Sequence, residues 1–119
     1  MSYSDIIDDS ALNALSDMVA GDPAFLAEMI DAFTEEAPAM LALMQSSLAT
    51  GDASELRRAA HSLKSNSATF GAMVLAGLCS RLEELGIAGR LDGASRLVSD
   101  CVAEYSRVEE ALTHRRAEL

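Results

Sequence analysis

His61 lies in a short stretch whose side chains could handle an anionic group. At about 100° per residue along a helix, the core-facing residues of this stretch fall within about 60° of Leu63, and His61 falls about 160° away. The core-facing set is Leu56, Ala59, Ala60, Leu63, Ser67 and Phe70. His61 is therefore expected to face solvent. The same face carries Arg57, Lys64, Ser65 and Ala68 within one or two turns.

The chemistry that this face suggests is the transfer of a phosphoryl group. A neutral imidazole nitrogen is a nucleophile that can attack phosphorus, and the Lys64 ammonium could offset charge on the phosphoryl oxygens. The small Ser65 and Ala68 side chains leave room for a second protein to bring its own reacting group to the ring. The alternative is an ordinary surface histidine on a charged helix face, and helix geometry alone does not decide between the two.

Other kinds of chemical site have weaker support in the sequence. The two histidines and two cysteines, His61, His114, Cys79 and Cys101, lack the spacing of metal ligands, and both cysteines stand at apolar helical positions that predict buried thiols. No glycine-rich loop of the phosphate-binding type is present, because no strand pattern precedes a suitable glycine run. We therefore expect neither a metal site nor a cofactor bound by this chain.

The composition describes a small acidic protein. The chain has 119 residues, 50% of them hydrophobic, with 19 Asp and Glu against 9 Lys and Arg and a formal net charge of −10. This size and apolar content predict one folded domain over residues 1–119. The acidic balance argues against binding to nucleic acid or to anionic membranes, since both need a surplus of basic side chains. No stretch resembles a signal peptide or a membrane span, so a cytoplasmic protein is expected.

The spacing of hydrophobic residues is helical almost throughout and predicts an all-α protein. A short helix is expected over residues 10–19, with Ser10 as its N-cap. A long helix should begin at Asp22 and Pro23 and end at Gly51, because its apolar stripe keeps its phase across Pro38. That stripe is Phe25, Met29, Phe33, Ala37, Met40, Met44 and Leu48.

Three further helices are predicted in the second half of the chain. One begins at Asp52, which with Glu55 forms a capping-box pattern, and runs to the turn at Gly71. The next carries Leu75, Leu78, Leu82 and Leu85 and is expected to close at Gly86. The last presents Leu97, Cys101, Tyr105, Val108 and Leu112 on one side. The simplest arrangement that buries all four apolar stripes is an antiparallel up-down four-helix bundle, with the short N-terminal helix across one end. The methionines are expected to fill gaps in its core.

Two segments around His61 carry a resemblance to a known family. Residues 60–72 read AHSLKSNSATFGA, and residues 78–83 read LCSRLE. Together they resemble the histidine-containing phosphotransfer (HPt) family of two-component phosphorelays, whose pattern is H-x-L-K-G-x-(S/A)-x-x-x-G-A with a Leu and Glu about one helix later. Members of this family are four-helix bundles that carry a phosphoryl group on one exposed histidine.

The resemblance implies a role for individual residues. It makes His61 the phosphoacceptor, Lys64 the side chain that balances the phosphoryl charge, and Glu83 a candidate for orienting the imidazole, although a solvated helix acid is an equally good interpretation of Glu83. Ser65 departs from the pattern, because the family has Gly there, and Asn66 is a candidate polar contact near the site.

The resemblance also implies partners. The chain would relay a phosphoryl group between a histidine kinase or a receiver aspartate and another receiver aspartate, as a monomeric carrier rather than an autonomous enzyme. The receiver would supply the Mg²⁺, and Arg57, Arg58, Ser65 and Ala68 would form a docking rim around His61. The alternative is a helical adaptor that binds receiver domains without being phosphorylated, which the serine at position 65 leaves open.

Overall fold

The chain folds into five helices. The computed structural model describes residue 3 and residues 5–119, so residues 1, 2 and 4 of the predicted domain lie outside the described part. The helices are α1 (Asp9–Met18), α2 (Pro23–Thr50), α3 (Ala53–Thr69), α4 (Met73–Ile87) and α5 (Ala94–Ala117). The described residues contain no strand, and the all-α prediction is confirmed.

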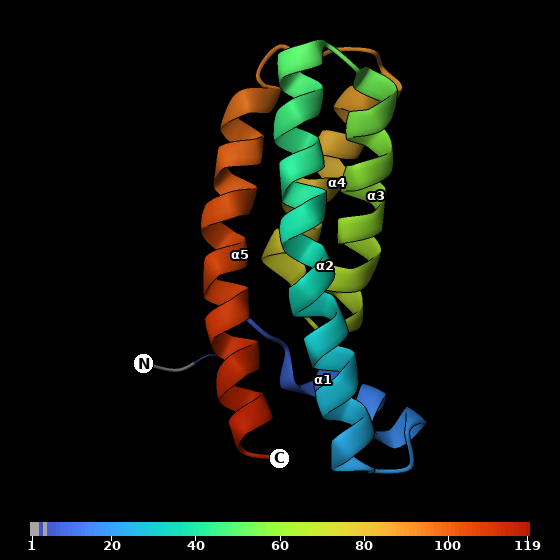
Figure 1. The fold of residues 1–119 in the computed structure, drawn as a ribbon, viewed down its shortest axis with the longest axis vertical. Coiled ribbons are helices and arrows are strands. Elements are labelled where there is room, and N and C mark those ends of the chain that lie inside the picture. The colour runs from blue at the N-terminus through green and yellow to red at the C-terminus, as the bar shows by residue number, and fades with distance from the viewer. Residues whose placement is uncertain (1–2, 4) are drawn as a thin grey trace.

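The four longer helices lie along the long axis of the molecule, and α1 lies at one end (Figure 1). Helix α3 packs against α4 and α2, and α5 packs against the same two helices. Helix α1 contacts α2 and α3. Each of the long helices therefore has two long neighbours, which is how amphipathic helices of this length cover their apolar faces.

Local capping signals account for most of the helix ends. Asp22 caps α2 by accepting a hydrogen bond from the Ala24 amide at 3.0 Å, and Pro23 takes the first helical position as predicted. Gly51 ends α2 with φ 73°, in the left-handed region. The Asp52 carboxylate accepts from the Glu55 amide at 2.9 Å and begins α3.

Two predicted helix ends are wrong. Ser10 is not the cap of α1, because Asp8 precedes the helix and its carboxylate accepts from the Ser10 amide at 2.9 Å. Gly86 does not close α4, because the helix continues through Gly86 to Ile87. Its backbone is buried against α3, and so this glycine serves helix packing rather than helix termination.

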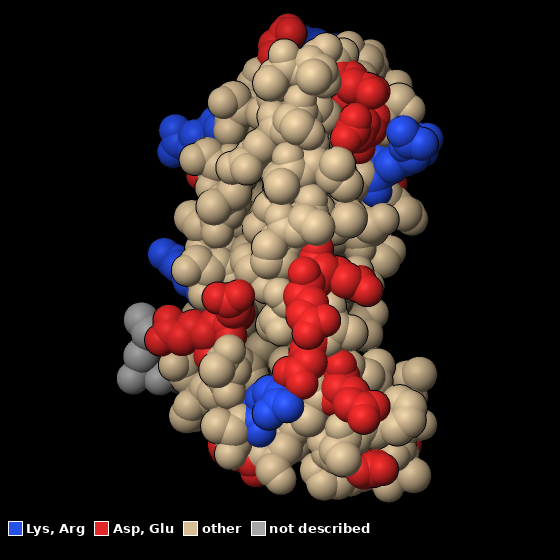
Figure 2. All heavy atoms as spheres, in the orientation of Figure 1, with Lys and Arg blue, Asp and Glu red and all other residues tan. Residues whose placement is uncertain are grey.

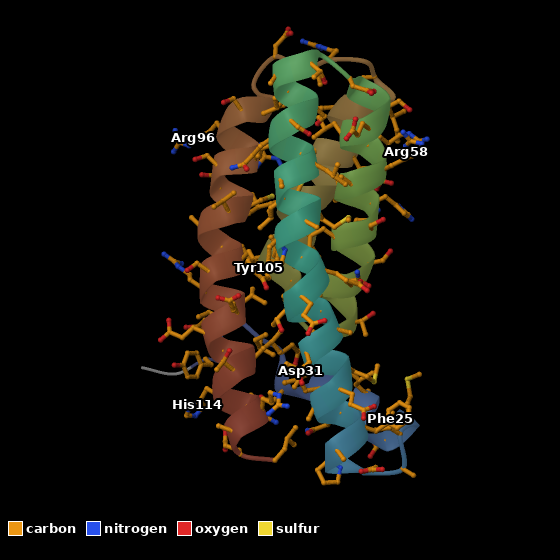
Figure 3. All side chains as sticks on the ribbon, in the orientation of Figure 1. Phe25, Asp31, Arg58, Arg96, Tyr105 and His114 are labelled. Carbon is orange, nitrogen blue, oxygen red and sulfur yellow. The ribbon has the colours of Figure 1, made fainter. Side chains whose placement is uncertain are left out.

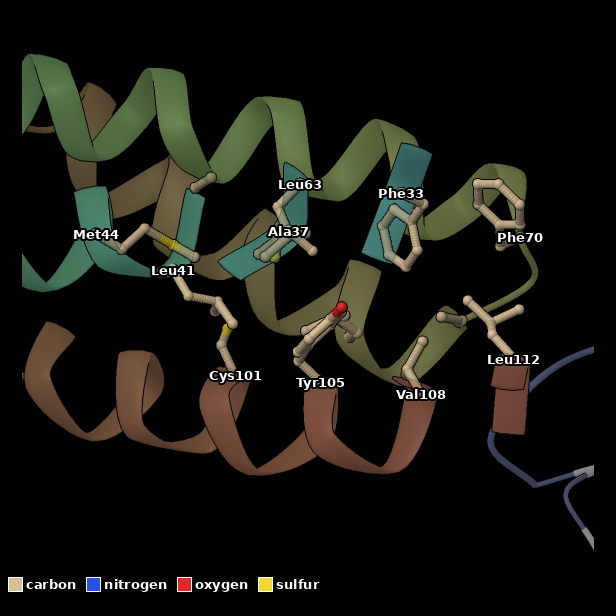
Figure 4. Close-up of a cluster of buried hydrophobic side chains, with 14 of the residues drawn as sticks. Phe33, Ala37, Leu41, Met44, Leu63, Phe70, Cys101, Tyr105, Val108 and Leu112 are labelled. Atoms are coloured by element: carbon tan, nitrogen blue, oxygen red, sulfur yellow. The ribbon is translucent and has the colours of Figure 1, made fainter. Parts of the chain in front are cut away.

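The core forms along the facing stripes of the four long helices (Figure 4). The predicted faces of α3 and α5 are buried in full, as are both cysteine thiols. On α2, however, Phe25 is 53% exposed, and Leu26 and Ile30 are buried instead. The first turns of α2 extend beyond α3 and α4, where α1 and the C-terminal end of α5 are near (Figure 1). Phe25 lies on the side of α2 away from α5 (Figure 3), so neither α3, α4 nor α5 covers it.

The methionines fill the core only in part. Of the five that the structure describes, Met44 is buried and Met29 and Met40 pack partly buried against the core, whereas Met18 and Met73 are exposed. Met18 lies at the end of α1 and Met73 at the start of α4. Their positions at helix ends explain why a periodicity that predicts burial along a helix fails for these two residues.

Ion pairs join the C-terminal end of α5 to α1 and to α2. Arg115 near the end of α5 forms an ion pair with Asp9 of α1. Arg116 binds both carboxylate oxygens of Asp31 on α2, at 2.7 and 2.8 Å. Figure 3 shows Asp31 and His114 at this end. Two cations at the end of α5 are also favoured by the helix dipole.

Acidic side chains outnumber basic ones on the face that Figure 2 shows, and most of the basic ones lie at its edges. This distribution follows the sequence, because residues 1–56, which include all of α1 and α2, contain eleven acidic and no basic side chains. Among the described residues, no helix combines the length and the hydrophobicity that crossing a membrane would require.

Gly71 joins α1 to the turn between α3 and α4. Its φ is 77°, and its carbonyl accepts a hydrogen bond from the Asp8 amide at 2.9 Å. A Cβ at this position would lie 2.7 Å from the Asp8 carbonyl oxygen and 2.9 Å from the Asp8 nitrogen. Glycine is therefore required here both for the backbone conformation and for space.

We expect Gly71→Ala to destabilise the fold by at least about 3 kcal/mol, as the sum of a left-handed alanine and the clash with α1. Urea unfolding followed by circular dichroism measures this change. Gly51→Ala is the matched control, because Gly51 also has a positive φ but no atom within 4 Å of its would-be Cβ. That variant should lose only about 1–2 kcal/mol. Equal losses in the two variants would contradict a close contact between Gly71 and α1.

Candidate functional site

Helix α3 presents His61 to solvent, as its helical phase predicts. The residues that face the core from α3, Leu56, Ala59, Ala60, Leu63 and Ser67, are all buried. The side chain of His61 is 58% exposed on the opposite face. The imidazole is thus held by a well-packed helix and is accessible to a second molecule.

Helix α4 brings Glu83 to the imidazole. The Glu83 Oε2 atom lies 2.6 Å from His61 Nδ1, and its Oε1 atom accepts a hydrogen bond from Lys64 Nζ. The Glu83 side chain is only 13% exposed, so this carboxylate is largely enclosed between the two helices. One carboxylate therefore bridges the two side chains that the sequence predicts to handle phosphate.

The charge on Glu83 determines which nitrogen of a neutral His61 ring carries the hydrogen. The hydrogen bond from Lys64, with a further one from His61, holds the pKa of Glu83 below its usual range against the opposing effect of burial. Glu83 is thus ionised at neutral pH and can only accept hydrogen bonds. His61 Nδ1 must then carry the proton, which leaves the lone pair of a neutral ring on Nε2, the nitrogen farther from Glu83.

Lys64 lies one turn after His61 on α3, with 32% of its side chain exposed. Its ammonium is paired with the Glu83 carboxylate, which also contacts the imidazole. A flexible four-carbon stem lets a lysine ammonium move between nearby anions. Lys64 can thus offset the negative charge of an anionic group that reaches His61.

The predicted docking-rim residues share the face of His61. Arg57, Arg58, Ser65 and Ala68 are all exposed on α3. Figure 3 shows Arg58 projecting outward from this helix. The face therefore combines cations with small side chains around a central imidazole, on a molecule whose formal net charge is −10.

Asn66 lies apart from this group. It lines a groove of about 190 Å³ between α2 and α3, together with Met29, Phe33 and other residues of those helices. In the described part of the chain, the Asn66 side chain has no hydrogen bond to His61, Lys64 or Glu83. The structure thus brings together His61, Lys64 and Glu83, and leaves Asn66 on the side of α3 that faces α2.

Neither cysteine is suited to act as a nucleophile or a metal ligand. Cys79 and Cys101 are fully buried free thiols, and contact with Cys101 together with burial raises the pKa of the Cys79 thiol well above its usual range. Such thiols are poor nucleophiles and poor metal ligands. Among the described residues, no group of three or more His, Cys, Asp or Glu side chains is arranged to hold a metal ion.

The ion pair between Lys64 and Glu83 was not predicted from the sequence. The two residues are 19 positions apart, and His61 and Glu83 are 22 apart, nearly symmetric about the turn at Gly71. In an antiparallel helix pair, residues equidistant from the turn lie side by side. The similar numbers of residues that separate Lys64 and Glu83 from the turn at Gly71 could have predicted this pair.

Comparisons with known proteins agree on the family of this fold and site. A model of the Hpt domain matches residues 28–118, which include all of α3, α4 and α5. The crystal structure of histidine-containing phosphotransfer protein B (HptB) from Pseudomonas aeruginosa PAO1 is similar, with a TM-score of 0.88 and 30% sequence identity over 96% of each chain. No curated protein matches this sequence.

Proposed function

The chain belongs to the Hpt domain family and functions in histidine phosphotransfer within phosphorelays, and from this premise we propose that His61 is the residue that carries the phosphoryl group. The observation that carries the proposal is the bridging Glu83 carboxylate, which leaves the exposed Nε2 of His61 as a nucleophile. Among the described residues, the carboxylate that pairs with His114, the other histidine, is that of Glu118, which is itself exposed. His61 is therefore the better acceptor.

In the proposed transfer, the Nε2 lone pair of His61 attacks the phosphorus of an aspartyl phosphate on a receiver domain. The Nε2–P bond forms as the P–O bond to the aspartate breaks, and the aspartate leaves as a carboxylate. The ring retains its Nδ1 proton and becomes cationic, so the Glu83 carboxylate offsets its charge. The reverse reaction passes the phosphoryl group to a second receiver.

Lys64 has a separate role in this scheme. Its ammonium is close enough to turn from Glu83 toward the phosphoryl oxygens as they arrive beside His61. Stabilising charge on those oxygens is the main task of a protein in phosphoryl transfer. The Mg²⁺ and the carboxylate pocket belong to the receiver, and the present chain acts as a carrier rather than as an autonomous enzyme.

The proposed partners are response-regulator receiver domains and a histidine kinase, with which proteins of the Hpt family interact. Arg57, Arg58, Ser65 and Ala68 form the docking rim, and the cations there suit the acidic pocket of a receiver. We further propose that the protein is a cytoplasmic monomer. Its helices α2 to α5 form an antiparallel up-down bundle to which α1 is added, as the packing of each long helix against two others supports.

Incubation with a phosphorylated receiver, labelled at its aspartate, tests this proposal. The chain should acquire a label that is labile in acid and stable in base, as expected of phosphohistidine, and peptide mapping should place it on the peptide that contains His61. An acid-stable label, or a label on the peptide that contains His114, would overturn the proposal. Binding of the receiver without any label would favour the adaptor.

A further inference from the structure

Gly86 lies at a close approach of α4 to the backbone of α3. A Cβ added to Gly86 would lie 2.8 Å from Arg57 Cβ, 2.9 Å from the Ala53 carbonyl oxygen and 3.0 Å from Arg57 Cα. Two of these three atoms are backbone atoms, and the third is fixed to the backbone. No change of side-chain rotamer could make room for a methyl group here.

Space, rather than backbone conformation, requires the glycine. Gly86 lies within α4, and it is not among the glycines with a positive φ. Glycine is a poor helix former, so a glycine inside a helix needs a packing reason. The contact with Arg57 and Ala53 supplies one.

This contact belongs to the same helix interface as the candidate site. Gly86 lies one turn after Glu83 on α4, and Arg57 lies one turn before His61 on α3. The contact between Gly86 and Arg57 thus lies one helical turn from the contact between Glu83 and His61, in one antiparallel helix pair. The distance between the two helices at Gly86 therefore affects the distance between Glu83 and the imidazole.

We propose that Gly86 is a positioning residue, which holds α4 close enough to α3 for the Glu83 carboxylate to reach both His61 and Lys64. The inference rests on the proposed function of His61. Ordinary van der Waals contact with a Cβ begins at 3.4 Å, so an alanine at position 86 must increase the distance between α3 and α4 at this point by about half an ångström. The 2.6 Å contact between Glu83 and His61 would then lengthen or break, and the ring would lose its preferred tautomer.

Gly86→Ala tests the proposal against Gly77→Ala. Both glycines lie in α4 and both variants gain helix propensity, but Gly77 has no atom within 4 Å of its would-be Cβ. The first readout is the tautomer of His61 in ¹⁵N NMR spectra of the free protein. Wild type and Gly77→Ala should show the Nδ1–H form, and Gly86→Ala should show a mixture of the two tautomers.

The second readout is the rate of phosphoryl transfer from a phosphorylated receiver. Gly86→Ala should slow transfer by about tenfold, because small misplacements of a reacting group are costly, and Gly77→Ala should not. In a Glu83→Ala background, Gly86→Ala should have no further effect, since the group through which it acts is gone. A packing defect without a positioning role would slow transfer equally in both backgrounds, which would overturn the inference.

Two outcomes separate this inference from the proposed function. A wild-type chain that takes no label on His61 contradicts the function. A labelled chain in which Gly86→Ala keeps the wild-type tautomer and rate contradicts only the positioning role. If circular dichroism shows that Gly86→Ala does not fold, the tautomer is measured in the double variant Arg57→Gly with Gly86→Ala. The Ala53 oxygen still crowds position 86 there, so a tautomer mixture supports the inference and a wild-type tautomer overturns it.

Discussion

His61→Gln should abolish the acid-labile label while leaving the fold intact. Glutamine can keep a hydrogen bond to Glu83, but its amide nitrogen has no lone pair that could attack phosphorus. The side chain is 58% exposed, so the substitution removes little packing and should change the free energy of unfolding by less than about 0.5 kcal/mol. Autoradiography after incubation with a phosphorylated receiver measures the label, and urea unfolding measures the stability.

The matched control for this variant is His114→Gln. His114 is the second histidine of the chain and is similarly exposed, with 56% of its side chain accessible. It lies near the end of α5, far along the chain from the site. Its replacement should leave the label at the wild-type level. A label that persists in His61→Gln and disappears in His114→Gln would show that His114 is the acceptor and would contradict the proposed role of His61.

The helical phase of α3 was predictable because the signals are local. The apolar set around Leu63 lies on one helix, and its phase alone places His61 on the opposite face, where the structure has it. The ends of α2 were predictable for the same reason, since Asp22, Pro23 and Gly51 act on their own turns. Features encoded within about one turn of helix can be read without knowing the tertiary structure.

Contacts between helices were predictable only in part. The sequence predicts that Gly86 ends a helix after Leu85. Only the close approach of α3 in the structure shows that this glycine lies inside α4 and is needed for helix packing. Glu83 reads equally well as a solvated acid, and only the register of α3 against α4 joins it to Lys64. The resemblance to the family suggested its contact with His61, but the three-membered arrangement depends on tertiary geometry.

The exposed Phe25 shows a different limit of sequence patterns. Its spacing from Met29 and Phe33 fits a helical stripe, yet the stripe that is buried at the start of α2 contains Leu26 and Ile30. Periodicity predicts which side of a helix is apolar, but it does not predict where along the helix a neighbour is present. At the start of α2, which projects past α3 and α4, neither of those two helices reaches the ring, and α5 lies on the other side of α2 (Figures 1 and 3).

Lys64→Ala should slow phosphoryl transfer by about tenfold to a hundredfold. Without the ammonium, charge on the phosphoryl oxygens is not offset, and the Glu83 carboxylate beside His61 repels the incoming group. The free energy of unfolding should fall by about 1–2 kcal/mol, because the Lys64 side chain is 32% exposed and the enclosed Glu83 carboxylate keeps its contact with His61. Single-turnover transfer from a phosphorylated receiver measures the rate, and urea unfolding measures the stability.

Arg96→Ala is the matched control for the loss of one positive charge. Arg96 lies on α5 and is exposed, and its one ion-pair partner among the described residues is Asp100, four residues later. This variant changes the net charge by the same amount as Lys64→Ala, so it reports any general electrostatic effect on docking. We expect it to transfer at the wild-type rate. A similar slowing in both variants would mean that Lys64 contributes only to the overall field, and a parallel loss of stability and rate in Lys64→Ala would mean that its role is structural.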